Sequence, residues 1–177
     1  MTTILGVDPG SRVTGFGVVR TDGESVIEVI SYGVIAPPLS LSFHERIGII
    51  AGEFEILLEK LQPQIAVIER VFLGKNADSA FKLGHARGVV VAAAARSGCG
   101  VVEYATRAVK QGITGNGNAS KEQVQTVLFS ALGIGERSAA LTPERNMADA
   151  SDALALAFFH SRNLEVLRRL KRAERNL

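Results

Sequence analysis

The stretch ILGVDPGSRVTGFGVV, residues 4–19, decides the fold of this 177-residue chain. It spans two short apolar runs, Thr3–Val7 and Thr14–Arg20, separated by the turn-forming sequence DPGS that begins at Asp8. An Asp-Gly pair at 22–23 then marks a hairpin into a third run, Ser25–Ile35, rich in Val and Ile. The opening of the chain therefore predicts three antiparallel strands, with a carboxylate at the end of the first.

Further along the chain, the apolar residues change to a helical spacing. Between Leu39 and Leu61 they recur every three or four positions, and Pro63 stops the helix that this predicts. Ile65–Ile68 is typical of a buried strand, and because a helix precedes it, it can lie parallel to the first strand. The other predicted elements are a strand at Gly100–Tyr104 and helices at Asp78–Arg96, Thr106–Gln111, Ser120–Leu132 and Met147–Leu164. An α/β fold is expected, with a five-stranded mixed sheet of three antiparallel N-terminal strands plus two parallel strands, flanked by helices.

Length and composition favour a single domain over residues 1–177, because 46% apolar residues can fill one substantial core. The basic tail at about 163–177 is a candidate for a frayed, mobile helix end. The lone Cys99 cannot form an intrachain disulfide, and one Cys with three scattered His cannot build a zinc cluster. The most apolar run, Gly88–Ala95, is too short to cross a bilayer. These features favour a cytoplasmic protein without a membrane partner.

Four carboxylates stand within or directly after apolar segments: Asp8, Glu69 in IAVIERVF, and Asp149 and Asp152 in NMADASDALAL. A charge in such a place is costly to bury unless a metal or another partner compensates it. Asp8 and Glu69 follow strands predicted to be parallel neighbours, whose carboxyl ends commonly bind ligands. Asp149 and Asp152 lie three apart on a helix and share a face. Together the four would form a Mg²⁺ site suited to phosphodiester hydrolysis.

Each carboxylate also has an ordinary structural explanation. Asp8 could simply open the Asp-Pro-Gly turn, and Glu69 could be solvated at a strand end. Asp149 could occupy the third position of a helix capped by Asn146, where the helix dipole favours an anion. The joint occurrence of all four favours the metal site.

Charge is unevenly distributed along the chain. Residues 1–60 hold 4 Lys/Arg and 8 Asp/Glu, whereas residues 61–177 hold 16 and 10. Such a basic excess could neutralise the phosphates of a nucleic acid, or it could belong to ordinary solvated helix faces. The basic residues near the proposed site are Arg70, Lys75, Lys82, Arg87, Arg96, Arg107, Lys110 and Lys121.

From about Ile4 to His160 the chain resembles the RuvC Holliday junction resolvases, a family with the ribonuclease H-like fold. Besides the opening stretch, the resemblance is carried by VIERVFLGKNADSAFKLGHARGVV, YATRAVKQGITGNGNASKEQV and DASDALALA. It implies a homodimeric endonuclease that resolves four-way DNA junctions by paired symmetric nicks in recombination and repair, leaving 5′-phosphate and 3′-hydroxyl ends. It also implies that Asp8, Glu69, Asp149 and Asp152 are the catalytic, metal-binding acids. One or two Mg²⁺ ions per active site are expected, with Mn²⁺ as a substitute.

The resemblance also implies DNA contacts. Lys110 and Lys121 match lysines near the scissile phosphate, and Phe72 matches an aromatic residue that stacks on bases at the junction centre. By physics alone, Phe72 could instead belong to the core. Lys75, Lys82 and Arg107 complete the expected DNA-binding set.

For its partners, the resemblance implies a second copy of the chain and the RuvA–RuvB branch-migration complex. The helix at about 78–96 resembles the family's dimer helix. This helix has a face suited to packing against a second copy of the chain, formed by Ala80, Leu83, Gly84, Arg87, Val91 and Ala94. The same face could instead be buried within the chain. The chain departs from the family pattern at Arg70 and His85, where many relatives carry Gln. Arg70 is a cation next to Glu69 that could strengthen binding of the DNA backbone or favour the ionised form of the Glu69 carboxyl group.

Parts of the sequence also resemble or are compatible with three other classes of protein. The opening glycine-rich turn also looks like the phosphate loop of sugar kinases and actin-like ATPases, but 177 residues leave little room for their second lobe. A noncatalytic junction-binding module would need the basic and aromatic residues but not four acids. The short resolvase-like nucleases of the YqgF family lack the VIERVF and KLGHARG stretches found here.

Overall fold

The computed structural model of this protein describes residues 1–23, 25–70, 76–134 and 144–174, without the side chains of residues 27, 144–146 and 165–174. The antiparallel strands are β1 (Thr2–Asp8), β2 (Thr14–Thr21) and β3 (Val26–Ile35). β4 (Ile65–Arg70) joins β1 in parallel, and β5 (Gly100–Ala105) joins β4 in parallel. The sheet order β3-β2-β1-β4-β5 confirms the predicted mixed sheet of five strands.

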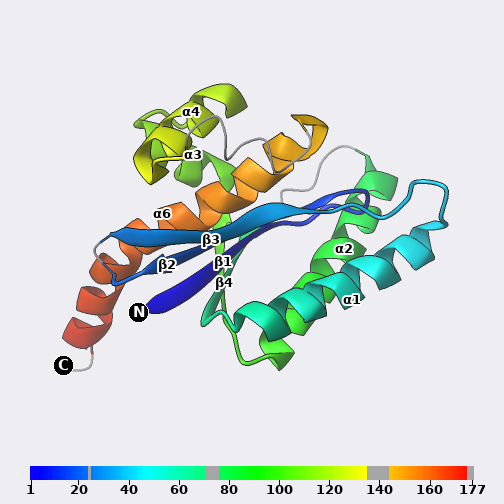
Figure 1. Cartoon of the computed structure of the whole chain (residues 1–177), viewed down its shortest axis with the longest axis horizontal. Helices are drawn as coiled ribbons and strands as arrows, with labels where there is room; N and C mark the ends of the chain where they lie inside the picture. The colour runs from blue at the N-terminus through cyan, green and yellow to red at the C-terminus, as the bar shows by residue number, and fades with distance from the viewer. Residues whose placement is uncertain (24, 71–75, 135–143, 175–177) are drawn as a thin grey trace.

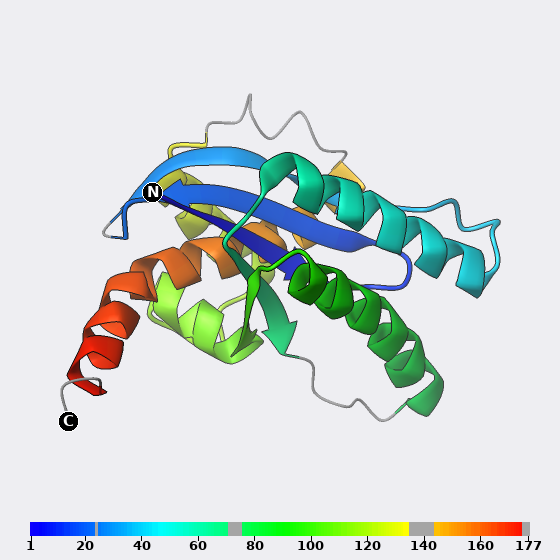
Figure 2. The ribbon, with the colours of Figure 1, turned by 90° about the horizontal axis from the view of Figure 1, so that it is seen from below.

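Helices cover both faces of this sheet (Figures 1 and 2). On one face lie α1 (Phe43–Leu61) and α2 (Ala77–Arg96), which contact each other. The other face carries α3 (Thr106–Thr114), α4 (Lys121–Leu132) and the long α6 (Glu144–Glu174), which crosses β1, β2 and β3. The protein therefore has three layers, with the sheet in the middle.

The alternation of side chains along β1 divides the core into two halves. Ile4 packs into the cluster that includes Leu128 of α4 and Leu154 of α6. The next residue, Leu5, points to the opposite face and packs with Phe54 of α1 and Val90 of α2. All six side chains are fully buried, as expected when successive strand residues face opposite sides of a covered sheet.

The ends of α1 and α6 differ from those predicted from the sequence. α1 begins at Phe43 rather than Leu39, because Ser42 and Glu45 form a capping box. α6 begins at Glu144 and continues to Glu174, beyond the predicted span of Met147–Leu164. Asn146 therefore lies inside α6, and the interpretation of Asn146 as the helix cap beside Asp149 is wrong. Among the described helices, none is both long and apolar enough to span a lipid bilayer.

Candidate active site

Two of the four predicted carboxylates meet at one edge of the sheet. Asp8 ends β1 and Glu69 lies near the end of β4, and the parallel register that pairs Val7 with Ile68 sets them side by side. They lie close enough for a protonated Asp8 to donate a hydrogen bond to the Glu69 carboxylate. Parallel pairing thus joins residues that are 61 positions apart, as the sequence predicted.

The other two carboxylates arrive on α6, which lies directly against the strand backbones. A Cβ added at Gly15, the partner of Asp8 in the β1–β2 register, would lie 2.0 Å from the backbone oxygen of Asp149. A Cβ at Gly6 would lie 2.0 Å from the backbone oxygen of Ala153. Only glycine permits such a close approach between a strand and a helix. These glycines therefore let α6 carry Asp149 and Asp152 to the edge where Asp8 lies.

The electrostatics of Asp8 show that the four acids form one cluster. Burial raises the pKa of Asp8 from 3.8 to about 8, with further contributions from the charge of Glu69, the charge of Asp152, the hydrogen bond with Glu69 and the charge of Asp149. Burial also raises the pKa of Asp149, while Lys121 lowers it and Asp152 raises it. Negative charge at this edge is therefore only partly compensated by the protein.

Lys121 and Lys110 bring positive charge to the cluster. The Lys121 ammonium forms an ion pair with Oδ2 of Asp152. Burial lowers the pKa of Lys121, but the hydrogen bond and charge of Asp152 and the charges of Asp8 and Asp149 outweigh burial and raise it. Lys110 donates from Nζ to the backbone oxygen of Ala119 at 2.7 Å and lines a small pocket together with Asp8, Glu69 and Asp152. Both lysines thus lie at the acidic cluster, although one is engaged by a backbone carbonyl.

Thr106 also belongs to this site, although the sequence patterns did not predict it. Its hydroxyl donates to Oε1 of Glu69 at 2.6 Å, and the residue lines the same pocket. A signal was available in the sequence, because Thr106 begins the helix predicted just after the Gly100–Tyr104 strand.

The chemistry of this donor set fits a hard divalent cation. Carboxylate oxygens are the ligands that Mg²⁺ and Mn²⁺ prefer, and such an ion would compensate the buried charge of Asp8. In this arrangement the side chain of Asp152 faces Lys121 and that of Glu69 faces Thr106. Within the described ranges, no group of three or more Asp, Glu, His or Cys side chains is arranged to hold an ion. The residues fit a metal by chemical type and place, with two of them turned toward protein partners.

The remaining residues predicted to contact DNA are dispersed. Arg107 is exposed on α3, on the same face of the sheet as α6. Lys82 lies on α2, on the opposite face, and pairs with Asp78 through Nζ and Oδ2 at 2.6 Å. Phe72 and Lys75 lie outside the described residues.

Arg70 does not face Glu69. Its Nε lies 4.0 Å from Oε2 of Glu103, and Glu103 also pairs with Arg87. Successive residues of a strand point to opposite faces, so Arg70 and Glu69 diverge. The prediction that the charge of Arg70 affects Glu69 is therefore wrong. Arg70 instead forms a charge cluster with Glu103 and with Arg87 of α2.

The face of α2 predicted for dimerisation is only partly open, with Gly84 exposed and Ala94 buried. Ala94 is fully buried, so for this residue the alternative of burial within the chain holds, whereas Arg87 is partly exposed and forms an ion pair with Glu103. The exposed residues include Phe81 at 71%, together with Gly84, His85 and Gly88. Among the residues that the structure describes, none comes within 4 Å of a Cβ added at either glycine, apart from the helix's own backbone and the adjacent residues. His85 packs edge-on against Phe43 of α1, with ring centres 5.5 Å apart.

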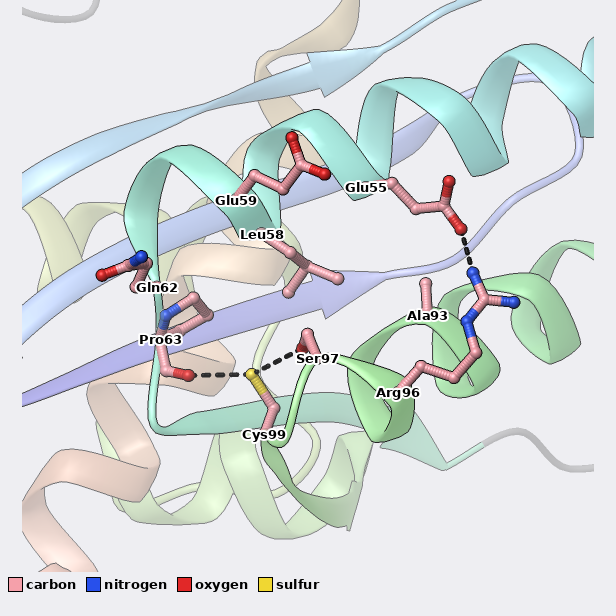
Figure 3. A pocket seen from close by; sticks show the side chains of 9 residues that line it. All are labelled: Glu55, Leu58, Glu59, Gln62, Pro63, Ala93, Arg96, Ser97 and Cys99. Atoms are coloured by element: carbon pink, nitrogen blue, oxygen red, sulfur yellow. Dashed lines mark hydrogen bonds and ion pairs between the residues drawn. The ribbon is translucent and has the colours of Figure 1, made fainter.

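A second hollow lies between the C-terminal parts of α1 and α2, and none of the four candidate metal-binding carboxylates lines it (Figure 3). Arg96 forms an ion pair with Glu55 across it. The Cys99 thiol donates to the backbone oxygen of Pro63 at 2.8 Å and is only 7% exposed. These contacts close the end of the α1–α2 pair and explain the buried cysteine by packing.

The sheet order, the long helix across one face and the carboxylates at the ends of β1 and β4 define the ribonuclease H-like class. The chain belongs to the crossover junction endodeoxyribonuclease RuvC family, whose family model matches residues 4–160.

Known proteins support this assignment over nearly the whole chain. The crossover junction endodeoxyribonuclease RuvC of Bdellovibrio bacteriovorus is 49% identical over 170 residues, which cover 96% of each protein. That of Marinobacter nauticus is 41% identical over 172 residues, covering 95% of this chain and 91% of the relative. The solved structure of T. thermophilus RuvC in complex with Holliday junction substrate superposes with a TM-score of 0.78 at 27% identity, covering 94% of this chain and 96% of that one. A yeast mitochondrial Holliday junction resolvase shares the fold, with a TM-score of 0.69 at 15% identity.

Proposed function

We propose that this protein resolves four-way DNA junctions by paired symmetric nicks during recombination and repair, through metal-assisted phosphodiester hydrolysis. The observation that carries the proposal is the convergence of Asp8, Glu69, Asp149 and Asp152 at one sheet edge, in a chain of the RuvC family. The junction-bound RuvC of T. thermophilus, which covers nearly the same length of chain, supports the choice of substrate.

The four carboxylates would hold one or two Mg²⁺ ions, with Mn²⁺ as a substitute. When bound, such an ion activates a water molecule as nucleophile and stabilises the charge that develops on the phosphate oxygens. Glu69 is held by Thr106, and Asp8 is buried against the other acids, so these two groups offer a fixed pair of oxygen donors. Hydrolysis at the 3′-oxygen would leave a 5′-phosphate and a 3′-hydroxyl.

Basic residues around the pocket would hold the DNA backbone. Lys110 and Lys121 are beside the acids and suited to the phosphate under attack, and the exposed Arg107 extends this surface along α3. Contacts of this kind position the backbone without reading its sequence. Lys82, Phe72 and Lys75 remain proposed DNA contacts on the strength of the family resemblance alone.

Paired nicks require two active sites, so the proposal includes a homodimer. The open face of α2 around Phe81, Gly84 and Gly88 supports this helix as the contact, because small residues allow two helices to approach closely. A cytoplasmic location and docking of the RuvA–RuvB branch-migration complex complete the proposed setting.

Cleavage of a labelled synthetic four-way junction tests the proposal, compared with linear duplex of the same sequence in Mg²⁺ and in EDTA. We expect paired nicks in the junction alone, only with Mg²⁺, and none with Asp8→Asn. Junction binding should survive in that variant because the basic residues are untouched. Glu53→Gln, which removes an exposed carboxylate from α1, is the matched control and should cleave normally.

Two results would contradict parts of this proposal. Wild-type protein that binds the junction but never cleaves it, across metals and junction sequences, would favour a noncatalytic binding module. Loss of binding together with cleavage in Asp8→Asn would mean that Asp8 supports the DNA-binding surface rather than the metal.

A further inference from the structure

Thr106 joins the end of one strand to the carboxylate of its neighbour. The parallel register pairs Glu69 with Tyr104 and Arg70 with Ala105, so Thr106 is the next residue beyond the edge of the sheet. From there its Oγ1 donates to Oε1 of Glu69 at 2.6 Å. The contact spans 37 positions in sequence and depends on the pairing of β4 with β5.

No requirement of α3 itself explains a threonine at this place. Thr106 is the first residue of α3, whose N-cap Ala105 makes no side-chain hydrogen bond. A hydroxyl at a helix start commonly caps the helix, but this one is directed to Glu69 instead. A β-branched residue also has a restricted χ1 angle, which holds the hydroxyl in one direction. The geometry therefore connects this side chain to the acidic site rather than to helix formation.

We propose that Thr106 is a positioning residue that orients the Glu69 carboxylate for binding of a divalent metal ion, an inference that rests on the proposed function. A glutamate side chain has several rotatable bonds, and one directed hydrogen bond to Oε1 fixes its rotation while leaving acceptor positions on both oxygens. Hydrogen bonds to ligating carboxylates act in this way at metal sites, and their removal typically weakens metal affinity about 10- to 100-fold.

Removal and retention of the hydroxyl can be compared directly. Thr106→Val keeps the shape and deletes the donor, whereas Thr106→Ser keeps the donor and deletes the methyl group. Thr126→Val is the matched control, because Thr126 is exposed on α4 and its hydroxyl donates to the backbone oxygen of Glu122, away from the acidic site. Mg²⁺ affinity would be measured by titration calorimetry, junction cleavage as a function of Mg²⁺ concentration, and thermal unfolding and junction binding in EDTA.

We expect Thr106→Val to weaken Mg²⁺ binding about 10-fold and to raise the Mg²⁺ concentration for half-maximal cleavage by a similar factor. Thr106→Ser should match wild type, and unfolding and junction binding in EDTA should be unchanged in all three variants. A valine variant with wild-type Mg²⁺ affinity would overturn the inference, and so would a serine variant as defective as the valine one. Wild-type protein that neither binds Mg²⁺ nor cleaves would overturn the proposed function and this inference with it, which separates the two failures.

Discussion

Ionisation of Asp8 should destabilise the metal-free protein at neutral pH. Its pKa rises from 3.8 to about 8 on folding, chiefly by burial and then by the charges of Glu69, Asp152 and Asp149. Because the folded-state pKa lies above the unfolded one, the stability contributed by this group is complete below about pH 3.8. It is lost as the pH rises through about 8. Asp8→Asn removes the titrating group and should remove this loss.

The size of the effect follows from the two pKa values. Each pH unit between them changes the free energy of unfolding by about 1.4 kcal/mol, so at pH 7 the ionised carboxyl costs on the order of 4 kcal/mol. A change of 1 kcal/mol shifts the melting temperature of a domain of this size by roughly 2–4 °C. Asp8→Asn should therefore melt about 10 °C higher than wild type at pH 7 in EDTA, and at nearly the same temperature at pH 4.

Circular dichroism during thermal and urea unfolding, at several pH values in EDTA, would measure this difference. Glu53→Gln serves as the control, because it removes an exposed carboxylate and should leave the pH profile of the melting temperature unchanged. Added Mg²⁺ should stabilise wild type more than Asp8→Asn and so reduce the gap. Equal stability of Asp8→Asn and wild type at pH 7, or a difference that does not change with pH, would refute the reasoning.

Two further predictions concern the placement of α6 and the binding of DNA. Gly15→Ala would put a Cβ 2.0 Å from the backbone oxygen of Asp149, so it should lower the melting temperature and abolish junction cleavage. Gly48→Ala, with no neighbour within 4 Å, should instead stabilise α1 by about 0.5–1 kcal/mol in urea unfolding, and a similar loss in both would contradict the packing argument. Lys110→Ala should weaken junction binding and reduce the slope of log K against log salt by about one, whereas an unchanged slope would remove Lys110 from the phosphate contacts.

Much of the fold follows from local patterns in the sequence. Alternating or continuous apolar runs predicted all five strands, and the spacing of apolar residues in Leu39–Leu61 predicted α1. The helix between the third and fourth strands made β1 and β4 parallel neighbours, so the meeting of Asp8 and Glu69 was also predictable. Helix ends were less predictable, because caps such as Ser42 depend on one or two side-chain hydrogen bonds.

The sequence by itself thus determined the strands, the helical faces and the identity of the acidic residues, since these depend on neighbours within a few positions. Tertiary structure alone decided the contacts that assemble the site. α6 reaches Asp8 because Gly15 allows backbone contact with Asp149, and Lys121 pairs with Asp152 because α4 packs beside α6. The bond from Thr106 to Glu69 likewise requires the register of β4 and β5. Such contacts join residues tens to more than a hundred positions apart, and their geometry is set by close packing of whole elements, which no local pattern encodes.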